Sequence, residues 1–305
     1  MSVNLTPKYI LFAQHGWADG NNAMLSLANQ LVTASEVAQT DSCVSIVAPD
    51  LGYLQTWLRI DPLIQAVEAL ALQQRAIHPN IPLRIIGHSM GGLIWLEVLN
   101  RHREWWADVH SLILIASPVG GADLGRMIDP FRLGIGVAAD LGTNRKPIAE
   151  QIAAEIPTLV IAGNCDEGSD GTVPVESTKF ANARFVCLPS LSHPVLRNHA
   201  SVVSIIQDFW QDTTLGEAIE YDQIIRRLHA VPGITDAHWR GFREATVIMK
   251  LDNGGTIRTW KNGLGIDHVF VASPEGNCLY AGFVGWLHTP DLQQALTEIR
   301  QTYSV

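Results

Sequence analysis

Six short apolar runs recur through the first 190 residues, and they constrain the fold more than any other feature of the chain. They cover residues 8–14, 45–50, 83–88, 111–118, 157–163 and 184–190. Each run is nearly continuous in apolar character, which is typical of strands buried on both faces of a parallel sheet. Amphipathic segments at 22–39, 61–77, 91–103 and 199–211 lie between and after them. The alternation predicts an α/β fold, a doubly wound, mostly parallel sheet with helices on both faces.

The pattern changes near residue 213. Apolar runs now follow one another closely, at 245–251, 256–261, 268–273 and 279–286, and residues 291–301 have a helical pattern. The turns between the runs are rich in Asp, Asn, Gly and Pro, which favours antiparallel hairpins. We therefore expect an α/β domain over 1–212 and a small α+β accessory unit over 213–305, helix, antiparallel strands and helix. That unit is either a further surface for a substrate or partner, or a stabilising appendage.

Residues 120–150 interrupt the alternation of strands and helices. The segment is rich in glycine and mixes apolar with charged side chains. A connection of this length is either a plain surface loop or a functional one. We predict a cap or lid over a pocket.

Composition narrows the class of partner. The 305 residues are 47% hydrophobic and 17% charged, as in an ordinary globular protein. The formal net charge of −9 argues against a nucleic-acid partner and does not favour an anionic membrane surface. No apolar stretch approaches the roughly 18 residues of a membrane span, and the N-terminus lacks a signal-peptide pattern.

The four cysteines are scattered and form no C-x-x-C pair: Cys43, Cys165, Cys187 and Cys278. We expect them to be small buried hydrophobic residues rather than a disulfide framework or a zinc site. This usage is typical of a reducing compartment and predicts a cytoplasmic protein. A chain that had lost its signal peptide would have the same pattern.

A serine framed by glycines lies between the third apolar run and the next helical segment, in Gly87-His88-Ser89-Met90-Gly91. Glycines leave room for a sharp strand-to-helix turn, and the first helical amides favour negative charge nearby. A serine hydroxyl attacks only with help from a base, an acid that orients the base, and donors for the oxyanion. The motif alone is equally typical of a glycine-rich turn with no chemical role.

Candidate acids and bases follow the last two apolar runs. The loop after 157–163 offers Asp166, Glu167 and Asp170, and the loop after 184–190 offers His193 and His199. In a doubly wound sheet these loops meet at the carboxyl ends of the strands, where Ser89 also lies. The acidic loop is otherwise a solvated turn or a cation site. Its spacing matches no known ligand loop, so we expect no metal and no cofactor.

These motifs together resemble the α/β-hydrolase fold, and within it the small serine esterases and lipases. The resemblance covers roughly residues 8–212. It is carried by GHSMGG (87–92), QHGWADG (14–20), VAPDLGY (47–53), DGTVP (170–174) and the histidine loop that starts at Ser192. The extra leading strands of larger members are missing, and residues after 212 are not part of the basic fold.

The resemblance implies a role for each matching residue. Ser89 is the nucleophile, His193 the general base and Asp170 the acid that orients it. The backbone amides of Met90, after the nucleophile, and of Trp17, after His-Gly, form the oxyanion hole.

The same resemblance separates the alternatives within each loop. The Asp-x-x-Val-Pro form favours Asp170 over Asp166, and His199 is then ordinary helix surface.

The predicted function is hydrolysis of a small-molecule carboxylic ester through an acyl-enzyme. Apolar residues within 120–150 indicate an apolar acyl or alcohol group: Met127, Ile128, Phe131, Leu133, Ile135 and Val137. A lipid-like substrate fits, although nothing in the sequence marks a lipid surface as a partner. Thioesterases, amidases and acyltransferases share the same fold and triad and stay open. So does a non-catalytic binding module on a hydrolase-like fold.

Overall fold

A computed structural model describes residues 6–32, 43–121, 140–216 and 223–303. The six apolar runs all form strands of one sheet: β1 (Pro7–Gln14), β2 (Cys43–Val47), β3 (Leu83–His88), β4 (Val109–Ile115), β5 (Thr158–Asn164) and β6 (Arg184–Pro189). Their order is β2-β1-β3-β4-β5-β6, and every neighbouring pair is parallel. The predicted α/β sheet is therefore confirmed.

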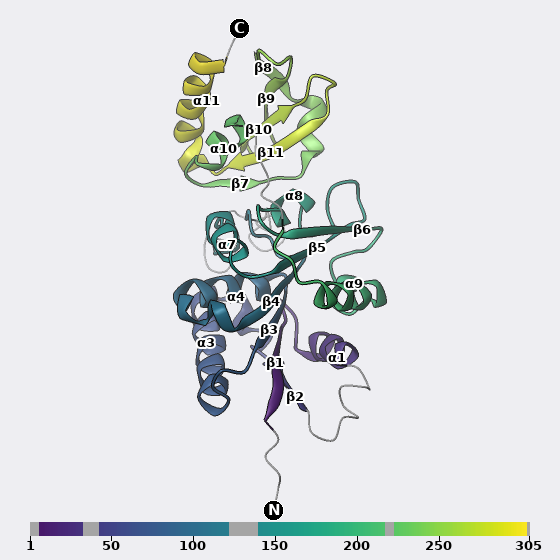
Figure 1. The fold of residues 1–305 in the computed structure, drawn as a ribbon. Coiled ribbons are helices and arrows are strands. Elements are labelled where there is room, and N and C mark those ends of the chain that lie inside the picture. The colour runs from purple at the N-terminus through teal and green to yellow at the C-terminus, as the bar shows by residue number, and fades with distance from the viewer. Residues whose placement is uncertain (1–5, 33–42, 122–139, 217–222, 304–305) are drawn as a thin grey trace, which may run out of the picture.

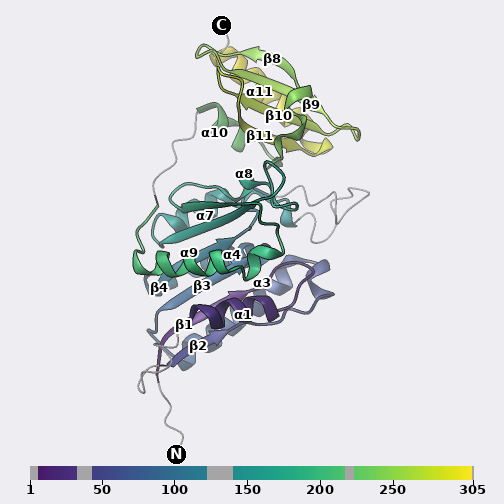
Figure 2. The same ribbon diagram turned by 90° about the vertical axis from the view of Figure 1, so that its right-hand side faces the viewer.

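Helices cover both faces of this sheet (Figures 1 and 2). On one face lie α3 (Ile60–Ile77), α4 (Met90–Arg101) and α7 (Lys146–Ala153), and on the other lie α1 (Asn22–Leu31) and α9 (Ala200–Gln211). Short turns complete the unit: η1 (Gln55–Trp57), η2 (Arg103–Asp108), α8 (Val175–Thr178) and η3 (Val195–Arg197). Helices are present in all four expected segments, but α1 ends at Leu31, and residues 33–39 of the first prediction lie outside the described residues. Helix α7 begins inside the range predicted as a cap.

Strand β1 shows why the central strands are apolar throughout. Ile10 and Phe12 pack in the core beneath α3 and α4, whereas Tyr9 and Leu11 pack in the core beneath α1 and α9. Successive side chains of a strand point to opposite faces, so a strand between two helical layers buries both sets. The outer strands β2 and β6 are only partly buried, because each has a neighbour on one side alone.

A second sheet follows along the chain. It contains β7 (Ile234–Asp236), β8 (Thr246–Lys250), β9 (Thr256–Lys261), β10 (Asp267–Ala272) and β11 (Cys278–Val284). The order is β7-β11-β10-β9-β8, and all pairs are antiparallel. Helices α10 (Gln223–His229) and α11 (Thr289–Tyr303) pack on one face, the turn η4 (Trp239–Glu244) packs on the other, and η5 (Trp286–His288) precedes α11. The unit lies beyond β5 and β6, at the end of the molecule opposite β2 (Figure 1).

Two predictions, the cap over 120–150 and the domain boundary near residue 213, are not tested by the described residues. Residues 122–139 of the predicted cap are not among the described residues. The predicted boundary near residue 213 falls between α9 and α10 and stays a prediction. None of the helices in the described ranges is long and apolar enough to cross a membrane.

The prediction that the four cysteines are buried was wrong. All four are free thiols, but Cys165 and Cys187 are exposed, and Cys43 and Cys278 are only partly buried. The reason lies in the topology, since Cys43 belongs to outer strand β2 and Cys187 to outer strand β6.

Candidate active site

Ser89 lies in a strained turn between β3 and α4. Its φ of 55° and ψ of −125° belong to a region that residues with a Cβ rarely occupy. Two backbone bonds hold the turn, because Ser89 N donates to Ile115 O at 2.8 Å and Gly92 N donates to Ser89 O at 3.1 Å. The sharp strand-to-helix turn expected from the glycine pattern is therefore present.

Close backbone approach explains the flanking glycines. A Cβ on Gly87 would lie 2.4 Å from the nitrogen of Gly92, and a Cβ on Gly92 would lie 2.1 Å from Ser117 Oγ. Both distances are far inside van der Waals contact. Side chains at these positions would push α4 away from β3 and β4.

The loop after β1 packs directly against this turn. A Cβ on Gly16 would lie 2.8 Å from Ser89 Cβ and 3.3 Å from the Met90 nitrogen. The two backbone segments expected to donate to an oxyanion, at Trp17 and at Met90, are therefore neighbours. Their role in binding an oxyanion stays a prediction.

The side chain of His15 holds the loop after β1 in place. Its Nε2 accepts from Leu51 N at 3.0 Å, and its Nδ1 lies 2.9 Å from Gly16 O. Because an amide only donates and a carbonyl only accepts, His15 is neutral with its proton on Nδ1. The imidazole thus ties the loop after β1 to the segment after β2, a structural role that the motif resemblance alone does not assign.

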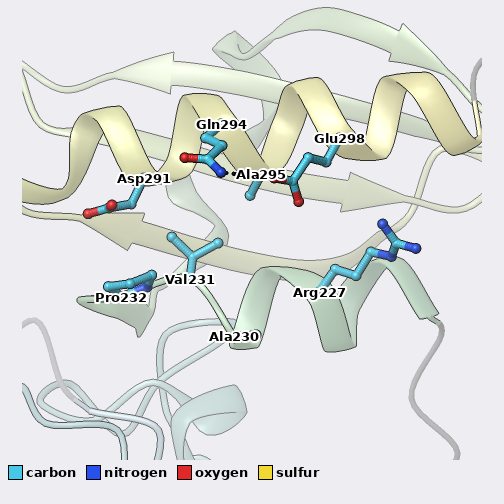
Figure 3. Close-up of a pocket in the computed structure, with 8 residues that line it drawn as sticks. All are labelled: Arg227, Ala230, Val231, Pro232, Asp291, Gln294, Ala295 and Glu298. Atoms are coloured by element: carbon cyan, nitrogen blue, oxygen red, sulfur yellow. Dashed lines mark hydrogen bonds between the residues drawn. The ribbon is translucent and has the colours of Figure 1, made fainter.

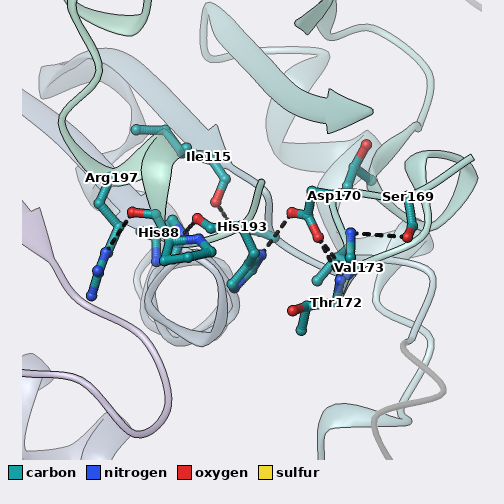
Figure 4. Close-up of polar contacts among 12 residues, drawn as sticks. His88, Ile115, Ser169, Asp170, Thr172, Val173, His193 and Arg197 are labelled. Carbon is teal, nitrogen blue, oxygen red and sulfur yellow. Dashed lines mark hydrogen bonds and ion pairs between the residues drawn. The ribbon is translucent and has the colours of Figure 1, made fainter. Parts of the chain in front are cut away.

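Asp170 and His193 form a close pair at the ends of β5 and β6 (Figure 4). His193 Nδ1 lies 2.7 Å from Asp170 Oδ2, and the His193 amide donates to Asp170 O at 2.8 Å. Asp170 is buried, and its Oδ1 accepts from the amides of Thr172 at 2.9 Å and Val173 at 2.7 Å. A carboxylate bonded in this way is held in one orientation and presents its second oxygen to the imidazole.

In the part of the chain that the structure describes, no contact joins His193 to Asp166 or Glu167. Asp166 Oδ1 accepts from the amide and the hydroxyl of Ser169, at 2.8 and 2.7 Å, and Oδ2 pairs with Arg240 of η4. Burial raises the pKa of Asp166, but the Ser169 bonds and the nearby cationic groups outweigh it and lower the pKa overall. The main-chain oxygen of Glu167 accepts from Trp239 Nε1 at 2.7 Å. The geometry therefore favours Asp170, as the motif did.

His199 does more than lie on a helix surface. Its Nδ1 accepts from Ser201 N at 3.2 Å, which caps the N-terminus of α9.

His88 is a further member of the site, to which the GHSMGG motif assigns no role. Its Nε2 lies 3.2 Å from His193 O, so it carries the proton and donates, and the two ring centroids are 4.6 Å apart (Figure 4). Burial, and then the charge of a protonated His193, lower the pKa of His88 well below its usual range. His88 therefore stays neutral and holds the backbone of the catalytic candidate next to Ser89.

Among the contacts of the described residues, no hydrogen bond joins Ser89 Oγ to His193. Catalytic hydrogen bonds are often long without substrate and tighten when it binds. What the structure brings together is the Asp170–His193 pair and, through His88, the segment that carries Ser89.

A cavity in the C-terminal unit lacks the side chains of a second catalytic site. It has a volume of about 360 Å³ and lies between α10 and α11 (Figure 3). Arg227, Asp291 and Glu298 are the charged residues that line it, and it contains no serine, cysteine or histidine. In the described ranges, no three His, Cys, Asp or Glu side chains are grouped as metal ligands would be.

Comparison with known proteins gives structural neighbours only. No protein-family model matches the sequence, and no curated protein matches it significantly. The mature form of lipase BlEst2 from Bacillus licheniformis is similar over 68% of this chain and 93% of its own, at 15% identity and a TM-score of 0.50. Its propeptide form is similar over 92% and 72%, at 12% identity and a TM-score of 0.51. Phospholipase PlaB from Legionella pneumophila is similar over 68% and 60%, at 18% identity and a TM-score of 0.51.

Identities this low bear on the fold alone. These neighbours agree with the parallel sheet described above. The chain has the α/β-hydrolase fold, with a small antiparallel sheet after it.

Proposed function

We propose that the protein is a serine hydrolase that cleaves carboxylic esters with Ser89, His193 and Asp170. The observation that carries the proposal is the pair of buried Asp170 and partly buried His193, 2.7 Å apart, at the same edge of the sheet as the strained Ser89. A carboxylate that accepts from Nδ1–H leaves Nε2 of the imidazole as the base.

In the proposed reaction these groups act in sequence. His193 Nε2 removes the proton of Ser89 Oγ as Oγ bonds to the acyl carbon. The amides of Trp17 and Met90 stabilise the oxyanion, an effect of about 3–4 kcal/mol per donor in comparable sites. The bond to the leaving oxygen then breaks as His193 returns the proton to the alcohol. Water repeats the sequence on the acyl-enzyme, and Asp170 stays ionised throughout.

An exposed apolar surface beside the site favours a substrate with an apolar group. Large side chains in and around η1 are solvent-exposed: Tyr53 by 55%, Leu54 by 78%, Trp57 by 38% and Leu58 by 68%. The ring of Trp57 lies 4.3 Å from that of Trp17, so this surface adjoins the proposed oxyanion loop. Contiguous exposed apolar side chains of this kind are typical of binding surfaces. An apolar acyl or alcohol group would cover it.

The same groups would serve a thioesterase, an amidase or an acyltransferase, and an ester is the substrate we propose first. A non-catalytic binding module is disfavoured because the strain at Ser89 costs stability without benefit to binding elsewhere.

The test is hydrolysis of p-nitrophenyl esters from acetate to palmitate, with thioester and amide substrates beside them. We expect Ser89→Ala, His193→Ala and Asp170→Asn to lose about 10⁴-fold or more in kcat. The matched control, Asp166→Asn in the same loop, loses at most about tenfold, since Asp166 acts only on the loop's position. A wild type that cleaves no ester and takes up no fluorophosphonate contradicts the proposal. A dead Asp166→Asn beside an active Asp170→Asn would move the acid to Asp166.

A further inference from the structure

We infer that Arg240 of the C-terminal unit is a positioning residue for the catalytic acid. Through Asp166 it holds the loop that carries Asp170. This inference rests on the proposed function, and it assigns residues 223–303 a part in the reaction.

A continuous chain of polar contacts leads from η4 to the acid. The guanidinium of Arg240 pairs with Asp166 Oδ2. Asp166 Oδ1 accepts from the hydroxyl of Ser169 at 2.7 Å, and that hydroxyl oxygen accepts from Gly171 N at 3.0 Å. The Gly171 amide belongs to the peptide group that follows Asp170. The guanidinium is thus three contacts from the backbone of the catalytic acid.

A second tie acts on the same loop from the same turn. Glu167 has a φ of 63°, which is unfavourable for a residue with a Cβ, and its carbonyl oxygen accepts from Trp239 Nε1 at 2.7 Å. A conformation that costs energy persists only where the surroundings hold it. Trp239 and Arg240 supply that support from outside the loop.

At Gly171 and Thr172 the loop is not packed against the second sheet. A cavity of about 240 Å³ separates Gly171 and Thr172 on the loop from Trp260 and His268 on the second sheet. The loop meets the C-terminal unit instead at Gly168, where a Cβ would lie 2.6 Å from Trp239 Nε1, and through the polar ties of Asp166 and Glu167 to η4. The pair is exposed and worth little to global stability, but displacement by a fraction of an ångström at a catalytic group lowers the rate.

The catalytic test compares variants on one short turn. Arg240→Ala removes the cation, Asp166→Asn removes the charge but keeps an oxygen for Ser169, and exposed Arg243→Ala on the same η4 is the matched control. Arg240→Ala and Asp166→Asn should each lower kcat for p-nitrophenyl butyrate about three- to tenfold, with KM within about twofold. The double variant should lose no more than either single one, and Arg240→Lys should recover part of the loss. Arg243→Ala should match the wild type.

Hydrogen–deuterium exchange over residues 164–175 supplies a readout independent of activity. We expect faster exchange in Arg240→Ala and Asp166→Asn than in Arg243→Ala. Unchanged exchange in Arg240→Ala, an unchanged kcat, or losses that multiply in the double variant would each overturn the inference while the proposed function stands. A wild type that hydrolyses no ester instead defeats the proposed function, and the positioning role with it.

Discussion

The strain at Ser89 can be measured by comparing two replacements that remove the same hydroxyl. Ser89→Ala and Ser89→Gly should both abolish ester hydrolysis, because neither has a nucleophile. They differ at the backbone. The turn has φ 55° and ψ −125°, which alanine tolerates no better than serine, whereas glycine enters this region freely.

The expected difference follows from two opposing effects. A residue with a Cβ in a sparsely populated region costs about 1–3 kcal/mol. Glycine loses more freedom on folding, which costs about 0.5–1 kcal/mol relative to alanine. Ser89→Gly should therefore be more stable than Ser89→Ala by about 1 kcal/mol, the middle of a range of about 0–2.5 kcal/mol.

Urea unfolding of the two variants, followed by circular dichroism and tryptophan fluorescence, measures the difference directly. Because the chain contains two sheets, the comparison uses the transition that both probes share in the two variants. If Ser89→Ala proves as stable as Ser89→Gly or more so, the turn carries no strain, and the reasoning from backbone geometry to function is refuted.

Two further predictions concern stability. The Lys146 ammonium lies 2.5 Å from Asp236 Oδ2 with both side chains buried, whereas His229 Nε2 is a more distant partner of Asp236 at 3.6 Å. Lys146→Ala therefore removes the main counter-charge of a buried carboxylate and should cost about 3–5 kcal/mol, measured by urea unfolding at pH 7. Burial raises the pKa of Asp236, but Lys146 outweighs it and lowers the pKa overall. The contribution of this ion pair to the free energy of unfolding is therefore complete above the unfolded-state pKa of about 4, and it is lost as pH falls through the folded-state pKa of Asp236. The gap between wild type and Lys146→Ala should accordingly shrink below about pH 4, and a constant gap would show that the pair is not the cause. Gly92→Ala, whose Cβ would lie 2.1 Å from Ser117 Oγ, should lower stability by about 1–3 kcal/mol and reduce activity, whereas Ser117→Ala should leave the expression and fold intact.

The ends of the strands in the first sheet could be predicted to within a few residues, because a short stretch of sequence is enough to show the apolar pattern of a buried strand. β1, β3, β4 and β5 are apolar on both faces, so each is a continuous run bounded by turn residues. The hairpins of the second sheet were equally clear from their turns. β7 was missed, since Ile234–Asp236 has only three residues and its charged member is buried against a lysine about 90 positions earlier.

Some residues of the candidate site could likewise be predicted from the sequence, and others could not. Ser89, Asp170 and His193 stand in motifs whose residues are close in sequence, and the motif separated Asp170 from Asp166 although both follow β5. His88 and His15 act through a single hydrogen bond each to a distant segment, His193 O and Leu51 N. A contact of that kind depends on the assembled sheet and leaves no periodic or compositional trace.

The contacts of the C-terminal unit argue against a mere appendage. Asp236 N donates to Gly120 O, and Thr235 Oγ1 donates to Gly142 O, so β7 touches both described ends of the segment that contains residues 122–139. Trp239 and Arg240 touch the acid loop. A stabilising appendage could attach at any surface of the sheet, including the helices that cover its faces. This one attaches to loops that follow β4 and β5 at the carboxyl edge, where the proposed chemistry occurs, so its removal should impair the reaction before it unfolds the sheet.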